Sequence, residues 1–277
     1  MENNRYRPLR YFVLVFALTW TFWITAAVVG RSQQADQGLV TVLLLLGLLV
    51  PPAVALVMVW TSKSQAMKTD LRQKLFSPSR VKPLAVLVAT VGFVVIVTIS
   101  ILISTLFGQS IEQLRFVEEY SFSLGGVSAL LTIILAAFFE ELGWRGYAQD
   151  ALANFSSWFK ASIIFGLAWT LWHLPLVFIP DTYQSGLLQQ SPWFVVNFFA
   201  GILPMAILFT WVYLKNNRSI IACMVFHFFV NLCQEGIAMT QVTKCLETVV
   251  IYLAAIIVVL LSKDLFFSSK HIGQMPD

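Results

Sequence analysis

Charged residues are scarce in this sequence. Asp, Glu, Lys and Arg make up 12% of the 277 residues, whereas hydrophobic residues make up 58%. A soluble domain usually carries about 25% charged residues, because its surface faces water. Together with a mean hydropathy of +0.78, this shortage excludes an ordinary soluble domain and indicates an integral membrane protein.

Several motifs are also missing. The three cysteines, Cys223, Cys233 and Cys245, form no Cys-x-x-Cys pair and lie in or beside apolar segments, so we expect small core residues without a disulfide framework or structural zinc. The His-Glu-x-x-His helix of many zinc peptidases is absent. We find no internal repeat, which weakens the analogy with transporters built from duplicated halves. No soluble domain or low-complexity tract interrupts the chain, so we expect one membrane domain over residues 1–277.

Long apolar runs are abundant. Because a helix needs about 20 apolar residues to cross the hydrocarbon core, these runs predict an all-α, polytopic membrane protein with eight transmembrane helices. The predicted spans are residues 11–29, 38–60, 83–107, 124–148, 157–179, 193–213, 219–240 and 245–262. Proline inside a helix removes a backbone hydrogen bond and clashes with the preceding turn, so interruptions are expected at Pro51, Pro52, Pro175 and Pro204.

The few basic residues are distributed unevenly between the two sides of these spans. If both termini lie in the cytoplasm, only three of the 18 Lys and Arg residues fall on the outer side: Arg31, Arg115 and Lys244. Lys and Arg favour cytoplasmic loops, so we predict that both termini are cytoplasmic. The same bias explains the net charge of +4 without a nucleic-acid partner. The polar, basic residues 61–83 are expected either to lie on the membrane surface or to form a solvated loop.

Ionisable residues within the apolar runs are the strongest candidates for function, because burying each one in a membrane costs about 2.5–3.5 kcal/mol. Two of the three histidines, His173 and His227, lie in such runs, and the third, His271, lies in the polar tail. The stretch FFEELGWRGYAQD at residues 138–150 ends the fourth run with two glutamates and an arginine. The candidate site is built from these residues.

Helical spacing separates the roles of the charged residues. Glu141 and Arg145 are four residues apart with the acid first, which is the favourable order for an ion pair. Glu140 is rotated by about 100° from Glu141, so it lies outside this pair and is available for chemistry. His227 and Asn231 are also four residues apart and face the same way.

Taken singly, these residues have ordinary structural interpretations: a packing histidine, an interfacial ion pair, or an amide that joins two helices. Taken together, an unpaired carboxylate, two histidines and an amide are what hydrolysis of a peptide bond requires. Glu140 can deprotonate a water, and His173 can hold that water or protonate the leaving amine. His227 and Asn231 can stabilise the oxyanion. Glu140, His173 and His227 also match the ligands of some zinc sites, but the metal-free mechanism is favoured and no cofactor is expected.

Three segments resemble the motifs of the CAAX protease and bacteriocin-processing family of intramembrane proteases. EELGWR at 140–145, WTLWH at 169–173 and HFFVN at 227–231 resemble, in order and spacing, the patterns E-E-x-x-x-R, F-x-x-x-H and H-x-x-x-N. Within this family the chain resembles the Ras-converting CAAX prenyl endopeptidases, and its motif-bearing core covers residues 124–240. One position departs from the pattern, because Trp169 stands where the family has Phe. One aromatic ring replaces another there, so we expect the packing role to be kept.

The resemblance implies an eight-helix endopeptidase that cleaves after a prenylated cysteine in a C-terminal CAAX motif and releases the last three residues. It also implies roles for six residues: water activation by Glu140 with His173, an oxyanion hole of His227 and Asn231, and support of the first motif helix by Glu141 and Arg145. The implied partners are a prenylated protein or peptide and the lipid bilayer. The implied location is the cell membrane of a prokaryote or the endoplasmic reticulum membrane of a eukaryote.

The motifs encode hydrolysis and leave the substrate open. A bacteriocin precursor or an unmodified membrane peptide fits them as well as a prenylated one does. Two alternatives belong to other classes of protein: a proton-coupled transporter, in which buried Glu and His form a relay, and a non-catalytic scaffold of the same fold. The oligomeric state is not indicated by the sequence.

Overall fold

The structure is a computed structural model that describes residues 6–117 and 129–267. The described residues form helices and connecting turns, with no β-strand and a single isolated bridge between Phe116 and Ile237. This confirms the predicted all-α class. The α-helices are α1 (Pro8–Gly30), α2 (Gln37–Thr61), α3 (Gln65–Phe76), α4 (Pro83–Thr105), α5 (Ala129–Gly143), α6 (Gln149–Ala153), α7 (Trp158–Trp172), α8 (Tyr183–Gln190), α9 (Pro192–Lys215), α10 (Ile220–Gly236), α11 (Gln241–Leu261) and α12 (Lys263–Phe267).

Six of the described helical segments are long and apolar enough to cross a membrane: α1, α2, α4, α7 with the 3₁₀ turn that follows it, α9 and α11. The shorter apolar helix α10, of 17 residues, adds a seventh candidate. The described part of the predicted span 124–148 begins at Ala129, and the residues just before it lie outside the description. The chain is therefore a multi-pass membrane protein with six to seven candidate spans, and the count of eight stays a prediction.

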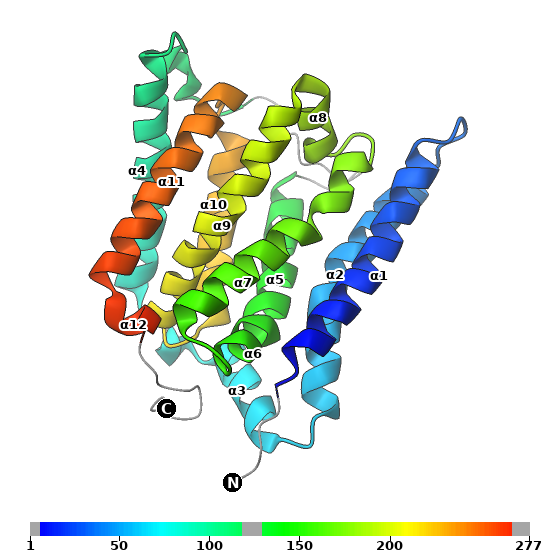
Figure 1. Ribbon diagram of the computed structural model, residues 1–277, viewed down its shortest axis with the longest axis vertical. Helices are drawn as coiled ribbons and strands as arrows, with labels where there is room; N and C mark the ends of the chain where they lie inside the picture. Colours follow the sequence, from blue (N-terminus) through cyan, green and yellow to red (C-terminus); the bar gives the residue numbers. More distant parts are fainter. Residues whose placement is uncertain (1–5, 118–128, 268–277) are drawn as a thin grey trace.

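The helices form a bundle with α5 and α10 near its centre (Figure 1). On one side α2 packs against α5 and α1 packs on α2, α4 and α11 lie on the other side, and α7 packs along α9. Large apolar side chains such as Val28, Leu84 and Leu253 are exposed on the spans, as expected of surfaces that face lipid. The start of α1, α3 and α12 lie at one end of the bundle, whereas α8 lies at the opposite end.

Three of the four prolines expected to interrupt helices lie inside continuous helices. The helix α2 runs through Pro51 and Pro52 without a break, and α9 runs through Pro204. Because Pro51 has no N–H, the carbonyl of Gly47 loses its helical partner. The hydroxyl of Thr19 in α1 donates to that carbonyl at 3.2 Å, so a neighbouring helix supplies the hydrogen bond that the proline removes.

A glycine brings α5 against α2. A Cβ added to Gly143, the last residue of α5, would lie 2.6 Å from Pro51 Cβ and 2.7 Å from the Pro51 carbonyl carbon. No side chain fits in that space without moving one of the helices. The glycine therefore sets how closely the end of α5, and the two glutamates before it, approach α2.

Beyond Gly143 the chain does not continue as a regular α-helix. A π-helical turn (Trp144–Ala148) leads into α6, and hydrogen bonds in such a turn reach one residue further than in an α-helix. Lys74 Nζ of α3 donates to the carbonyls of Arg145 and Gly146 at 3.2 and 3.3 Å. The hydroxyl of Tyr213 in α9 lies 3.2 Å from the Arg145 carbonyl and 3.0 Å from Asp150 Oδ1, and its single proton can go to either oxygen. Donors from two other helices thus stabilise the irregular end of the predicted span 124–148.

Lys74 also belongs to a buried ion-pair cluster, formed by Asp70, Lys74, Asp150 and Arg218. Asp150 is fully buried and lies 2.6 Å from Lys74 Nζ and 2.5 Å from Arg218 Nη2. Asp70 pairs with the same two cations at 3.2 and 2.5 Å. Burial by itself would raise the pKa of Asp70, but Lys74 and Arg218 outweigh it and hold that pKa below its ordinary value. The helix α3 is therefore docked by charge against the bundle and is not a solvated loop.

Candidate active site

The two neighbouring glutamates at the end of α5 contact different groups. Glu141 is fully buried, and its Oε1 lies 3.0 Å from Arg145 Nη1, so the predicted ion pair is present. The guanidinium of Arg145 also lies 4.7 Å from the ring centre of Phe165 and 4.9 Å from that of Phe209. These aromatic faces stabilise the parts of the cation that Glu141 does not reach.

Glu141 has a second partner that helical spacing did not indicate. Its Oε1 also accepts a hydrogen bond from His227 Nδ1 at 2.8 Å, across 86 positions of sequence. An ionised carboxylate only accepts hydrogen bonds, so Nδ1 of His227 carries a proton and Nε2 is the nitrogen left for other contacts. Glu141 therefore orients one of the candidate catalytic histidines in addition to neutralising Arg145.

Glu140 is held by two tryptophans. Its Oε2 accepts hydrogen bonds from the indole N–H of Trp169 at 2.8 Å and from that of Trp144 at 3.3 Å. No donor among the described residues contacts its other oxygen, and no described cation forms an ion pair with it. A phenylalanine at position 169 would pack but could not donate, so the departure from the family pattern adds a hydrogen bond to packing. The indole N–H was the available signal for this contact.

His173 lies at a break in the fifth predicted span. The helix α7 ends at Trp172, and a 3₁₀ turn (Leu174–Phe178) that contains Pro175 follows. This confirms the predicted interruption at Pro175. The carbonyl of Trp169 accepts a hydrogen bond from His173 Nδ1 at 2.8 Å, which leaves Nε2 as the nitrogen with a free lone pair. Trp169 thus orients Glu140 through its indole and His173 through its backbone.

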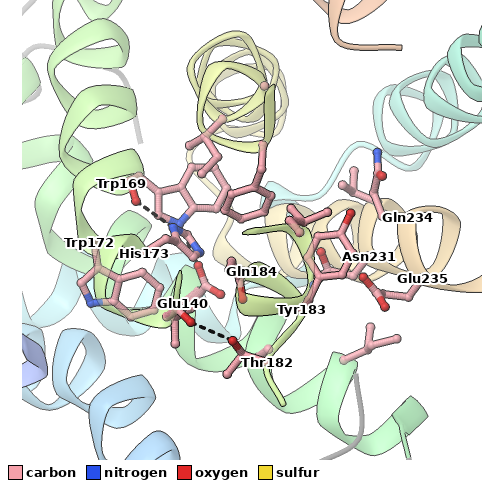
Figure 2. Close-up of a pocket in the computed structure, with 18 of the residues that line it drawn as sticks. Glu140, Trp169, Trp172, His173, Thr182, Tyr183, Gln184, Asn231, Gln234 and Glu235 are labelled. Atoms are coloured by element: carbon pink, nitrogen blue, oxygen red, sulfur yellow. Dashed lines mark hydrogen bonds between the residues drawn. The ribbon is translucent and has the colours of Figure 1, made fainter. Parts of the chain in front are cut away.

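All four residues predicted to be catalytic line one cavity, which has a volume of about 530 Å³. The ring of Trp169 contacts both imidazoles, with its centre 6.0 Å from that of His173 and 5.9 Å from that of His227. Figure 2 shows Glu140 beside Trp169, Trp172 and His173, with Asn231 further along the wall. The structure therefore brings together side chains from α5, the end of α7 and α10 that are far apart in the sequence.

The cavity extends from these residues towards the end of the bundle where α8 lies. Its wall includes residues of the first halves of α2, α9 and α11 and the last turns of α10. A second, more polar hollow of about 430 Å³ shares eight lining residues with it, among them Tyr183, Gln234 and Lys244. These three residues, which the sequence did not single out as site residues, mark where the two hollows meet.

The alternative zinc site does not fit this arrangement. Within the described ranges, no three His, Cys, Asp or Glu side chains are grouped so that they could hold a metal ion.

Comparison with known proteins gives two matches. Residues 123–233 match the family described as type II CAAX prenyl endopeptidase Rce1-like. The chain is also 41% identical over 267 residues to the CAAX prenyl protease 2 of Methanococcus maripaludis, and this match covers 96% of the chain and 98% of the relative. The matched family segment contains all three motif regions, from Glu140 to Asn231.

Proposed function

The chain belongs to the Rce1-like family of type II CAAX prenyl endopeptidases, and we propose that it cleaves after a prenylated cysteine in a C-terminal CAAX motif and releases the last three residues. It is a membrane peptidase of this family. The observation that carries the proposed mechanism is the meeting of Glu140, His173, His227 and Asn231 around one cavity. Each residue has a role that its contacts support.

Glu140 is the general base in this proposal. The two indole donors hold its Oε2, so its second oxygen can take a proton from a water in the cavity. That water attacks the carbonyl carbon of the peptide bond after the modified cysteine. His173, whose Nε2 carries the free lone pair, accepts a hydrogen bond from the water. The proton that Glu140 has taken is then relayed through Nε2 of His173 to the leaving amine as the carbon–nitrogen bond breaks.

His227 and Asn231 form the proposed oxyanion hole. Nδ1 of His227 is held by the Glu141 carboxylate, so the oxyanion would be bound at Nε2, which must carry a proton to donate to it. The amide of Asn231, one helical turn further along α10, supplies a second donor. Donors aimed at the developing oxyanion are worth about 10²- to 10³-fold in rate each. Glu141 and Arg145 are supporting residues, because they hold His227 and the end of α5 in place.

The proposal extends to the membrane arrangement. We infer one membrane domain with eight spans and both termini in the cytoplasm, placed in the cell membrane of a prokaryote or the endoplasmic reticulum membrane of a eukaryote. The basic residues of α3 and of the turn before α10 then face the cytoplasm. Labelling of single cysteines at Lys263 and at Gly186 from each side of sealed vesicles tests this orientation. Labelling of the Gly186 position from the cytoplasmic side would show that the cavity end is cytoplasmic and that the charge rule fails here.

A cleavage assay tests the proposed activity. The purified protein, reconstituted in nanodiscs, is given a farnesylated CAAX peptide, the same peptide without the lipid, and a bacteriocin-type precursor peptide. The proposal expects release of the C-terminal tripeptide from the farnesylated peptide alone, and no loss of activity with a chelator. Cleavage of the unmodified peptides at equal rate would assign another substrate, and loss of activity restored by zinc would overturn the metal-free mechanism.

A further inference from the structure

Lys244 is the one Lys or Arg among the described residues that line the two hollows. It lies in the first turns of α11, where the positive end of the helix dipole disfavours a cation. Its ammonium donates to the Tyr183 hydroxyl at 3.1 Å and to the Gln234 carbonyl at 2.9 Å, and it lies 4.9 Å from the ring centre of Tyr183. An ammonium has three N–H donors, so two neutral oxygens do not use all of them.

Two acids share this part of the cavity wall with Lys244. Glu235 and Glu247 both line the cavity, and the buried Glu247 accepts a hydrogen bond from the Gln234 amide at 2.7 Å. A purely structural role for Lys244 would be to neutralise these acids. Its position where the two hollows meet gives it a second use, because a peptide that extends from the catalytic residues along α10 reaches it.

The distance along α10 supports that second use. His227, Asn231 and Gln234 lie on one face of the helix. Gln234 follows His227 by seven residues, which corresponds to about 10 Å along the helix axis. Three extended residues also span about 10 Å. If the scissile carbonyl is bound by His227 and Asn231, the end of a three-residue leaving group therefore lies beside Gln234, whose carbonyl contacts Lys244.

We propose that Lys244, with the Tyr183 hydroxyl, binds the free C-terminal carboxylate of the substrate. The inference rests on the proposed function, since it takes the bond cleaved to lie between His227 and Glu140. A carboxylate bound at this distance places the peptide bond three residues before the C-terminus at the catalytic residues, so that this bond is the one cleaved. Substrates with a blocked or longer C-terminus lose the charge-assisted hydrogen bond, which is stronger than a neutral one.

The test compares two farnesylated peptides that differ only in a C-terminal carboxylate or carboxamide. For the wild type we expect kcat/KM to be at least about tenfold higher for the acid. Lys244→Met is expected to bring the ratio of acid to amide close to one, mainly by raising KM for the acid. Lys244→Arg keeps a cation and restores part of the preference. Because the ratio is measured within each variant, loss of folded protein does not alter it.

Two further variants separate binding from structure. Lys160→Met removes an exposed lysine outside the cavity and should keep the wild-type ratio. Lys244→Met with Glu247→Gln removes a charge of each sign, and the ratio should still fall to one. A Lys244→Met enzyme that keeps the full preference for the acid overturns the inference. A wild type that cleaves no farnesylated peptide of either kind overturns the proposed function instead.

Discussion

The two ends of the bundle use buried charge in opposite ways. At the end where α3 lies, Asp150 contacts Lys74, Arg218 and the Tyr213 hydroxyl, so each of its oxygens has a partner. On the side of the cavity, Glu140 contacts only two neutral indoles among the described residues and faces a hollow. Fully paired charges hold helices together, whereas an acid without a cation beside a cavity can exchange protons with a ligand.

The comparison also applies to two adjacent residues. Glu141 is bound by Arg145 and His227, and Glu140 by Trp144 and Trp169, although the two acids differ in position by a single residue. Like Asp150, Glu141 is therefore paired with charged or hydrogen-bonding partners, whereas Glu140 faces the cavity. Substituting one residue of each pair should separate the two uses of charge, and the expected effects decrease from Glu140 to Asp70.

Glu140→Gln should remove most of the activity and leave the fold intact. An amide can accept the two indole hydrogen bonds but cannot deprotonate water, so we expect a loss of about 10²- to 10⁴-fold in kcat. The melting temperature should stay close to that of the wild type. Glu141→Gln is the matched control, and it should lower the melting temperature because Arg145 is left buried without its acid. Equal effects of both variants on stability would remove the distinction between the two glutamates.

Asp150→Asn should lower the stability of the fold and leave the activity of the folded protein intact. Removing one partner from a buried ion pair typically costs about 3–5 kcal/mol, and here Lys74 and Arg218 both lose a carboxylate. We expect a marked drop in melting temperature in detergent, with kcat of the folded fraction unchanged. The exposed Asp264 of α12 provides the control, since Asp264→Asn should leave the melting temperature as it is. An Asp150→Asn protein of full stability would contradict a structural role for the cluster.

Trp169→Phe should weaken the hold on Glu140. The ring is kept but the 2.8 Å hydrogen bond to Oε2 is lost, and bonds to charged groups are worth about 1.5–3 kcal/mol. We expect kcat to fall about tenfold. Trp172→Phe is the comparison, because the indole of Trp172 donates to Thr19 and not to Glu140. An equal fall in kcat in both variants would show that Trp169 acts by packing alone.

Asp70→Asn should have the smallest effect, and one that depends on pH. The pKa of Asp70 is lowered in the folded protein, so its ion pairs stabilise the fold above the ordinary pKa of an aspartate and stop doing so as pH falls through the lowered value. We expect the variant to be less stable than the wild type by about 1 kcal/mol or less at pH 7. The difference in melting temperature should vanish in strong acid; a difference that persists there would contradict the assignment.

What could be predicted from the sequence was local. The spacing of Glu141 and Arg145 predicted their ion pair, and Pro175 predicted the break beside His173, because helical geometry relates residues a few positions apart. The contact between Glu141 and His227 joins residues 86 positions apart, so no spacing rule indicates it. At position 169 the family pattern predicts only an aromatic ring that packs, and it does not predict the hydrogen bond from the indole to Glu140.

The burial of two cations at the basic end of the molecule is likewise not predictable from local sequence. Lys74 belongs to the polar residues 61–83, yet it is almost fully buried between Asp150 and the carbonyls of the π-helical turn. Arg218 lies in the turn before α10, yet it pairs with Asp70 and Asp150. A cation is buried where other helices supply acids to pair with it. The composition of the segment around the cation does not show which acids those are.

The most direct measurement of the central claim is product analysis in ¹⁸O-labelled water. Wild type and Glu140→Gln, each in nanodiscs, are incubated with a farnesylated CAAX peptide, and the products are weighed by mass spectrometry. The account predicts an intact tripeptide from the wild type, one ¹⁸O atom in the new carboxylate of the farnesylated cysteine, and neither product from Glu140→Gln above background. Cleavage at another bond, or equal tripeptide release by Glu140→Gln, would contradict it.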